Sequence, residues 1–370
     1  MQFEWLKYDL KDNPFVTSPI VNVFSNDKRI NGQLFCKEIV SDEFEKLMTL
    51  ISEEPNMIFV YSPISVLGTG KSALMAAAYW ELRKKKENAI WAEATAGIAT
   101  SPTLGRVVDS MLAEGVIDRM KKMIGDISYD RIFRMLRTRF TPTPGLVGAL
   151  TKVLQTTPDE TAKKFTNVRR SLLTFSAIDV FGYLTALMME CGLKRPTIFI
   201  DQFEEFVVTH HGFALLNKLG NEMNDLLRAT QGKVTLVVSL HPEAEGVFRE
   251  AAGRYVGELA PISDQTMIKV PLFDQDDSVK LATCYLQEYR VEGSEKPQIH
   301  PFQEDVLRYT CVDVHRRLRA FIIALHNALL QGARQGYVEI NGGFISNEGN
   351  HVKIFGKSSD WRKFKKGELK

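Results

Sequence analysis

Short, uninterrupted apolar runs alternate with longer segments of helical periodicity between residues 57 and 260 of this chain. Four of the runs are rich in β-branched and aromatic residues, and they begin at Met57, Ala89, Thr197 and Gly232. Such runs predict strands that are buried on both faces. Because helical patterns separate the strands, the order favours an α/β fold, a three-layer sandwich with a mainly parallel sheet.

The pattern changes outside this region and divides the chain into further parts. We expect an N-terminal lead-in over residues 1–50, a core over 51–260, a helical lid over 261–345 and a basic tail over 346–370. In the lead-in, Asn31-Gly32 predicts a hairpin turn, and a helix is expected from about Ser41. Within the core, residues from about 101 to 170 are helical and much longer than a parallel crossover needs. They predict a helical insertion with a surface of its own.

A glycine-containing loop follows the first of the predicted strands. Its sequence matches the phosphate-binding pattern G-x-x-x-x-G-K-[ST], with Ser65 in place of the first glycine. Gly68 and Gly70 would let the backbone take positive φ, so that successive N–H groups turn toward an anion. Lys71 is expected to face solvent and bridge the β- and γ-phosphates, while the Ser72 hydroxyl would bind Mg²⁺. The predicted nucleotide-contacting residues of the loop are Ser65, Gly68, Thr69, Gly70, Lys71, Ser72 and Ala73.

An ordinary strand-to-helix turn could match the phosphate-binding pattern by accident, but a second motif argues against this alternative. The run Thr197–Asp201 resembles a Walker B strand, so Asp201 would lie at the carboxyl end of a buried strand and hold Mg²⁺. Gln202 follows, where most such ATPases carry the glutamate that polarises the attacking water. If the chain turns helical there, Glu204 or Glu205 returns to the face of Asp201 and takes this role. The alternative for one of the two glutamates is an acidic first turn that complements a helix dipole.

Composition narrows the class of protein further. With 44% hydrophobic residues the chain can bury a large core, and a net charge of +2 neither requires nor excludes nucleic acid. The four cysteines are scattered without metal-ligand spacing, which predicts a reduced, cytoplasmic protein. There is no signal-peptide pattern and no apolar run long enough to span a bilayer, so no membrane partner is expected. His210-His211 lacks ligand spacing and no nucleophile elbow occurs, which disfavours a metallohydrolase or a serine hydrolase.

The order of these motifs resembles the AAA+ ATPases, most closely the branch of the origin-recognition and Cdc6-type initiators, over about residues 10–345. The string Val314–Phe321 resembles the lid motif of that branch, in which an arginine called sensor 2 points to the γ-phosphate. Arg316 matches this arginine best, and Arg317 is the second choice. The resemblance also assigns Ser239 and His241 to the polar sensor 1, and Arg254, or else Arg249, to an arginine finger. For any one of these arginines, a surface salt bridge is the alternative.

The resemblance implies an ATPase that binds ATP with Mg²⁺ and assembles with copies of itself, with double-stranded DNA as a candidate partner. Two features depart from it. Few residues follow the lid, so the winged-helix domain of the initiators has no visible counterpart. The string Asp201–Glu205 is also similar to the Walker B strand of STAND-type signalling NTPases. That similarity implies the alternative, a slow nucleotide switch that regulates a partner protein in signalling or defence.

Overall fold

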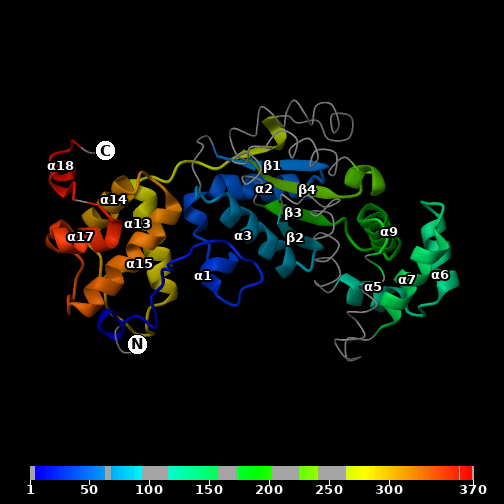
Figure 1. The fold of residues 1–370 in the computed structure, drawn as a ribbon, viewed down its shortest axis with the longest axis horizontal. Coiled ribbons are helices and arrows are strands. Elements are labelled where there is room, and N and C mark those ends of the chain that lie inside the picture. The colour runs from blue at the N-terminus through cyan, green and yellow to red at the C-terminus, as the bar shows by residue number, and fades with distance from the viewer. Residues whose placement is uncertain are drawn as a thin grey trace. The chain divides into compact units, whose positions relative to one another are not determined.

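The computed structural model describes most of the chain (Figure 1). The described residues are 5–62, 68–93, 116–156, 172, 174–201, 225–240, 264–357 and 359–368. The chain divides into two compact units. We call them the helical unit, made of Met1–Glu45, Ser62–Ala77 and Lys269–Lys370, and the sheet unit, made of Lys46–Tyr61 and Ala78–Ile268. No helix among the described residues is both long and apolar enough to cross a membrane.

The sheet unit is built on a single sheet. In the part of the chain that the structure describes, the sheet has five strands in the order β2-β3-β4-β1-β5 (Figure 1). The strands are β1 (Met57–Tyr61), β2 (Ala89–Glu93), β3 (Thr197–Asp201), β4 (Thr235–Leu240) and β5 (Met267–Lys269). β2 pairs with β3, β3 with β4 and β4 with β1, each time in parallel. The predicted α/β fold with a mainly parallel sheet is confirmed, and each of the four apolar runs forms a strand.

Helices make up most of the remaining described residues. Those of the sheet unit are α5 (Val116–Ile124), α6 (Tyr129–Arg137), α7 (Pro144–Gln155) and α9 (Ala177–Glu190). Those of the helical unit are α1 (Lys28–Asn31), α13 (Gln275–Glu288), α14 (Glu304–Asp313), α15 (Leu318–Arg334), α16 (Gly342–Ser346), α17 (Glu348–Phe355) and α18 (Trp361–Lys365). Two helices, α2 (Ser41–Ser52) and α3 (Lys71–Lys84), contribute residues to both units. Single 3-10 turns occur at Leu6–Tyr8, Lys37–Ile39 and Asp264–Thr266.

Apolar side chains cover both faces of the sheet, which explains why its strands read as continuous apolar runs. On one face, Trp91 of β2 stacks on Phe199 of β3 with 6.0 Å between the ring centroids, and Tyr79 of α3 meets Phe199 edge-on. The neighbours of Phe199 in the strand, Ile198 and Ile200, point to the opposite face. There they join the core that includes the buried residues of α9. The two helix layers predicted around the sheet are therefore present.

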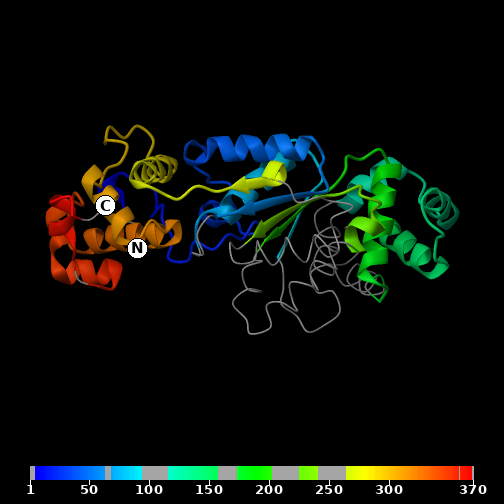
Figure 2. The same ribbon diagram turned by 90° about the horizontal axis from the view of Figure 1, so that it is seen from above.

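The described part of the predicted insertion is helical. Helix α6 packs against α7 and α9, and α5 packs against α7 (Figure 2). Ile132 and Leu136 form the buried side of α6. Before α7, the Thr143 N–H donates a hydrogen bond of 2.9 Å to the Tyr183 hydroxyl of α9. Since α9 leads into β3, the insertion is attached to the sheet through the helix that precedes a central strand.

In the helical unit, N-terminal residues share one core with the C-terminal helices. Phe15 stacks on Tyr285 of α13 with 5.7 Å between the ring centroids. The Tyr8 hydroxyl donates to the Tyr337 carbonyl at 2.9 Å. Residues predicted as a lead-in therefore belong to the same packed unit as the predicted lid.

The hairpin predicted at Asn31-Gly32 is wrong. Asn31 is the last residue of α1, and Gly32 follows it in the left-handed conformation with a φ of 85°. At the other end of this short helix, the Asp27 side chain accepts a hydrogen bond from the Arg29 N–H. An Asn-Gly pair suits a helix end as well as a hairpin, because both need a residue with positive φ. The helix predicted from Ser41 is confirmed.

The basic C-terminal residues fold onto α14. The Tyr309 hydroxyl of α14 lies 2.9 Å from Nε2 of the buried His351 and accepts the Asp360 N–H at 3.0 Å. Two aromatic rings of the tail, Trp361 and Phe364, pack edge-on against Tyr309 at 5.0 and 5.4 Å. The aromatic residues that interleave the basic ones are thus part of a core, and several of the cations remain exposed outside it.

Candidate functional site

The glycine-containing loop has the backbone geometry that its sequence predicts. β1 ends at Tyr61, and α3 begins at Lys71. Between them, Gly68 and Gly70 have φ values of 82° and 101°, a conformation that other residues rarely adopt. The Leu74 N–H bonds to the Gly70 carbonyl and closes the first turn of α3. The first N–H groups of such a helix have no partner within it and carry partial positive charge, so this turn can hold an anion.

Side chains around the turn are more buried than the sequence suggests. Lys71 was expected to face solvent, but it is only 3% exposed. The hydroxyls of Thr69 and Ser62 are buried and have no hydrogen-bond partner in the structure as described. An unsatisfied buried hydroxyl costs about 1–3 kcal/mol. Ligand oxygens or water that enter the turn would remove this cost.

The start of α15 lies directly against the loop. The Arg319 N–H donates to the Gly68 carbonyl at 3.2 Å. A Cβ added to Gly68 would lie 2.6 Å from the Cβ of Arg319, and one added to Gly70 would lie 3.3 Å from Cδ2 of Leu318. Gly68 is therefore required for two reasons, its positive φ and its close approach to α15.

Arg319 is a candidate site residue that sequence reasoning missed. Its Nε atom is buried and has no hydrogen-bond partner among the described residues. Arg316 and Arg317, the arginines that the motif favours, are exposed in the turn before α15. Their assigned role as sensor 2 stays a prediction. The sequence signal for Arg319 is its place two residues after Arg317 in the same basic string, but only the tertiary fold brings it to Gly68.

Two further candidates lie at the carboxyl edge of the sheet. Asp201 ends β3 and Ser239 is the next-to-last residue of β4. Ile200 pairs with Val238, so the following residues, Asp201 and Ser239, are level on neighbouring strands. They are 2% and 0% exposed, and the Ser239 hydroxyl has no hydrogen-bond partner among the described residues. A carboxylate and a hydroxyl side by side at this edge could provide some of the ligands of a Mg²⁺ site, because Mg²⁺ prefers oxygen ligands.

The register extends to the strand that leads into the loop. Ser239 pairs with Val60, one residue before the end of β1. The carboxyl ends of β1, β3 and β4 therefore lie at one edge, as expected for the ligand-binding edge of a parallel sheet. Sequence reasoning predicted the positions of Asp201 and Ser239 at strand ends correctly.

The other predicted site residues cannot be placed. Ser65, Glu204, Glu205, His241, Arg249 and Arg254 lie outside the described residues. Their roles stay predictions. Within the described ranges, no group of three or more His, Cys, Asp or Glu side chains could hold a metal ion by itself.

The four cysteines are all described, and none forms a disulfide. Burial raises the pKa of the Cys191 thiol to about 11 and that of Cys311 to about 12. Both thiols are therefore protonated at neutral pH, and protonated thiols are poor nucleophiles. These two cysteines fit structural positions better than catalytic ones.

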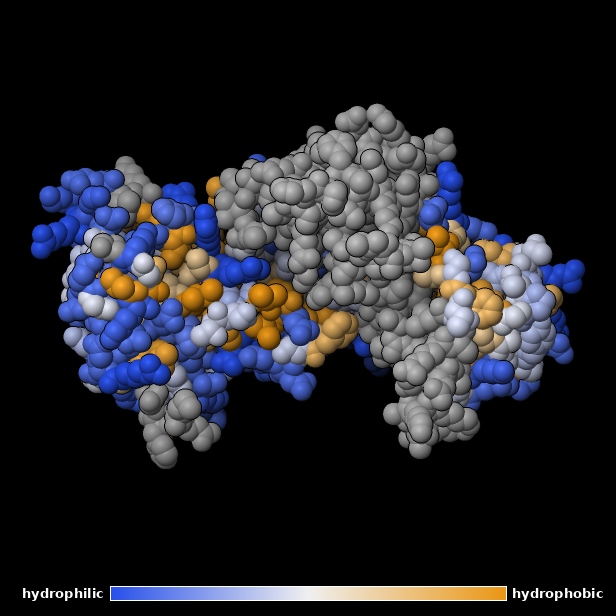
Figure 3. Space-filling view, in the orientation of Figure 1, coloured by the Kyte–Doolittle hydropathy of each residue, from blue (hydrophilic) through white to orange (hydrophobic). Residues whose placement is uncertain are grey.

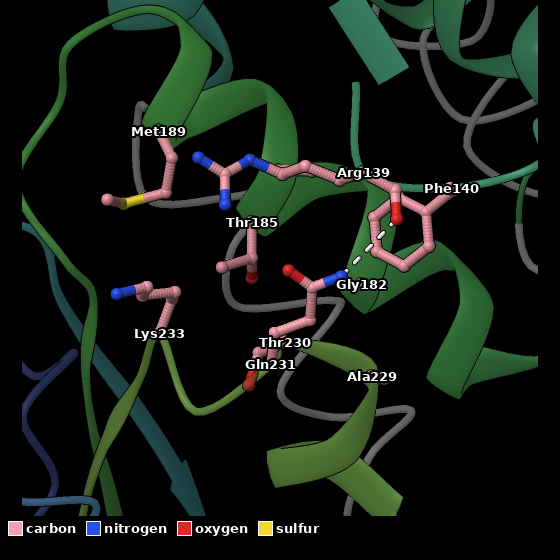
Figure 4. Close-up of a pocket in the computed structure, with 10 residues that line it drawn as sticks. Arg139, Phe140, Gly182, Thr185, Met189, Ala229, Thr230, Gln231 and Lys233 are labelled. Carbon is pink, nitrogen blue, oxygen red and sulfur yellow. Dashed lines mark hydrogen bonds between the residues drawn. The ribbon is translucent and has the colours of Figure 1, made fainter. Parts of the chain in front are cut away.

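A small pocket in the sheet unit lies between the residues after α6, α9 and the turn before β4 (Figure 4). Arg139, Thr185 and Lys233 are among its lining residues, and the Gln231 side chain donates to the Arg139 carbonyl at 3.3 Å. Its volume of about 10 Å³ is the space of a single water molecule. A water there would satisfy the buried Thr185 hydroxyl, which has no partner among the described residues. The pocket is too small for a nucleotide.

The parallel sheet and its strand–loop–helix connection define a P-loop type of α/β fold. No family model matches the sequence, and no curated protein matches it. The chain is similar to Cdc6p from Pyrobaculum aerophilum, with a TM-score of 0.44, 14% identity, and coverage of 86% of this chain and 68% of that one. It is also similar to the ORC2 protein of Aeropyrum pernix in its ADPNP–ADP complexes, with a TM-score of 0.47, 14% identity, and coverage of 87% and 66%.

A third similar structure is the Walker-type ATPase paby2304 of Pyrococcus abyssi, with a TM-score of 0.43, 15% identity, and coverage of 80% of this chain and 69% of that one. The chain thus spans about two thirds of the length of these proteins. They include Cdc6 and origin-recognition proteins. The likeness is distant and is one of fold.

Proposed function

We propose that this protein binds ATP with Mg²⁺, hydrolyses it and assembles with copies of itself in a nucleotide-dependent way. The observation that carries the proposal is the loop at Gly68 and Gly70, with its two positive φ values and α3 starting at Lys71. An anion-binding turn of this form, followed by lysine and serine, suits the β- and γ-phosphates of a nucleoside triphosphate.

Each residue of the loop has a separate task in this proposal. The N–H groups of the turn and of the first turn of α3 hold the phosphates. Lys71 supplies a positive charge, and its burial places this charge where water screens it little. Ser72 and Asp201 supply oxygen ligands for Mg²⁺. Arg319, held against Gly68, is the lid arginine best placed to sense the nucleotide, with Arg316 and Arg317 as the alternatives from the motif.

Hydrolysis needs a group that activates water and groups that stabilise developing charge. Gln202 cannot act as a base, so Glu204 or Glu205 takes this role. Ser239, level with Asp201 at the sheet edge, and His241 are the polar residues of sensor 1. Arg254, or else Arg249, reaches the γ-phosphate of a neighbouring subunit. Such an arginine supplied in trans makes turnover depend on assembly.

Two alternative biological roles are candidates for such an ATP-binding protein. Assembly on double-stranded DNA is the candidate purpose that follows from the initiator-like motifs. The replacement of the usual glutamate by Gln202 favours a second candidate, a slow STAND-like switch that regulates a partner protein. The cytoplasm is the proposed location in both cases.

One experiment tests the proposal and separates its two forms. ATP turnover and oligomeric mass are measured with and without Mg·ATP and double-stranded DNA. An assembling ATPase gains mass with ATP and hydrolyses it with multiple turnovers. A protein that binds ATP but stays monomeric and turns it over slowly supports the switch. A protein that does not bind ATP contradicts both forms.

A further inference from the structure

Helix α6 carries an outer face made mainly of arginine. Its buried side is formed by Ile132 and Leu136. At 100° per residue, Arg134 lies directly opposite this side, and Arg131 and Arg137 flank it by about 60° each. All three arginines are exposed. The solvent-facing side of this helix therefore presents mainly guanidinium groups.

The charges of these three arginines are not neutralised by ion pairs within the described structure. None of the three arginines makes an ion pair with a described residue, and Arg134 makes one hydrogen bond, from Nε to the Asp130 carbonyl at 3.3 Å. The other exposed side chains of this face are Asp130 and Thr138. Asp130 lies in the first turn, where its negative charge complements the helix dipole.

Three of the basic residues around α6 behave differently, because they already have partners. Arg119 donates to the Asn88 side chain, and Arg139 pairs with Glu190 at 3.1 Å. Lys121 pairs with Asp118. In Figure 3 the surface over α5, α6 and α7 shows hydrophilic residues along its outer edge. Lys122 of α5 and Lys152 of α7 are also exposed without an ion pair among the described residues, but each helix carries only one such cation, whereas α6 carries three.

We propose that this arginine face of α6 binds double-stranded DNA. An α-helix fits the major groove, which is about 12 Å wide. With α6 in the groove, Arg131 and Arg137 diverge to the two sides and reach phosphates of both strands, while Arg134 points to the base edges. Guanidinium groups bind phosphate oxygens with two parallel hydrogen bonds, and bind guanine in the same way.

An acidic protein partner fits this face less well. Protein interfaces usually contain a buried apolar or aromatic anchor at their centre. By helical position, no apolar side chain lies between Arg131, Arg134 and Arg137, and Asp130 would repel a negatively charged protein as much as it would repel DNA. Three arginines without an apolar centre suit a regular polyanion, whose phosphates alone supply most of the binding energy.

The inference rests on the DNA-associated form of the proposed function and names its surface. It does not depend on the nucleotide site. Arg131, Arg134 and Arg137 belong to the insertion of the sheet unit, whereas the loop at Gly68 belongs to the helical unit. DNA binding and ATP binding can therefore be lost separately.

The test measures the affinity of the protein for a fluorescent DNA duplex of about three helical turns. Binding is monitored by fluorescence anisotropy at salt concentrations from about 50 to 200 mM. The variant is the triple charge reversal Arg131→Glu, Arg134→Glu and Arg137→Glu. The matched control reverses three exposed cations of the tail, Lys353→Glu, Arg362→Glu and Lys366→Glu, and so makes the same change in net charge. The milder triple Arg→Gln variant of α6 covers the case in which the reversal unfolds the helix.

We expect the α6 variants to bind the duplex at least tenfold more weakly and to reduce the salt slope by about 2, one for each of the two lost phosphate contacts. The tail control should stay within about twofold of the wild type. Equal losses in both variants would show a non-specific charge effect and overturn the assignment, as would unchanged binding by a folded α6 variant. Tighter binding of single-stranded DNA or RNA than of the duplex would overturn the groove geometry.

If the wild type binds no duplex even at the lowest salt, this inference and the DNA-associated form of the proposed function both fail. The proposal that the protein binds ATP would not be affected, because it is tested separately by measuring ATP binding on the same protein. If the wild type binds the duplex and only the α6 assignment fails, DNA association survives with another surface.

Discussion

The two units of this protein each carry candidate site residues and fix them in different ways. In the helical unit, the loop is fixed by the positive φ values of Gly68 and Gly70 and by the contact of Gly68 with Arg319. In the sheet unit, Asp201 and Ser239 are fixed by strand register. The first arrangement holds phosphates through the backbone, and the second places side-chain oxygens at a sheet edge. Changes in the helical unit should therefore reduce nucleotide binding, and changes in the sheet unit should reduce the chemical step.

The largest expected effect is the loss of the arginine supplied in trans. Arg254→Ala should bind ATP normally and hydrolyse it about a thousandfold or more slowly, because developing charge on the γ-phosphate is no longer stabilised. Arg249→Ala is the matched variant and should have a small effect. When Arg254→Ala is mixed with Lys71→Ala, some turnover should return, because one subunit supplies the loop and the other the arginine. Full turnover in both arginine variants of a protein that stays monomeric would exclude this form of assembly.

The next effect tests the sheet unit. Glu204→Gln or Glu205→Gln should slow turnover by about a hundredfold to ten-thousandfold while ATP stays bound, since the general base is lost. Asp201→Asn should weaken the dependence of binding and turnover on Mg²⁺. The measurements are phosphate release and equilibrium binding on the same samples. If neither glutamate variant slows turnover, water is activated by another group, and the switch form of the proposal gains support.

A substitution in the helical unit tests the contact between the loop and α15. Gly68→Ala brings a Cβ within 2.6 Å of Arg319 and should abolish ATP binding and destabilise the unit. Gly336→Ala is the matched control, because Gly336 has a φ of 79° and nothing within 4 Å of an added Cβ. The control should cost only the strain of positive φ, about 1–2 kcal/mol. Equal destabilisation of the two variants, with ATP binding intact in both, would show that the Arg319 contact has no role.

The smallest expected effect distinguishes the lid arginines. Arg319→Ala should weaken ATP binding by about tenfold to a hundredfold, because a hydrogen bond between charged groups is worth about 1.5–3 kcal/mol. Arg317→Ala, at an exposed position two residues earlier, should leave it within about twofold. Titration of each variant with ATP gives the comparison. If Arg317→Ala weakened ATP binding more than Arg319→Ala did, the sensor role would belong to the arginines that the motif favours.

Local sequence predicts much of this fold. The strands are buried on both faces, so their apolar runs are visible without any tertiary information, and the glycines of the loop are required by their own φ angles. The strand-end position of Asp201 follows from the same pattern. Features that depend on residues close in sequence were therefore predicted correctly, with Asn31-Gly32 as the exception, because its conformation suits two different structures.

Tertiary contacts account for what sequence did not predict. Nothing local shows that Lys71 is buried or that Arg319, about 250 residues from the loop, lies against Gly68. The sequence of the tail also does not show that Trp361 and Phe364 pack on Tyr309. The arginine face of α6 became visible only when the structure showed which side of that helix is buried.

The central claim is that the loop at Gly68 and Gly70 binds the triphosphate of ATP with the help of Lys71. The most direct test is thermal unfolding of the wild type and of Lys71→Ala with increasing Mg·ATP. Because Lys71 is buried, its removal changes the stability of the free protein, so the quantity compared is the increase that ATP causes in each protein. The account predicts about 2.7 kcal/mol of stabilisation of the wild type when ATP is at a hundred times its Kd, and almost none for Lys71→Ala. An equal increase in both proteins, or no increase in the wild type, would contradict it.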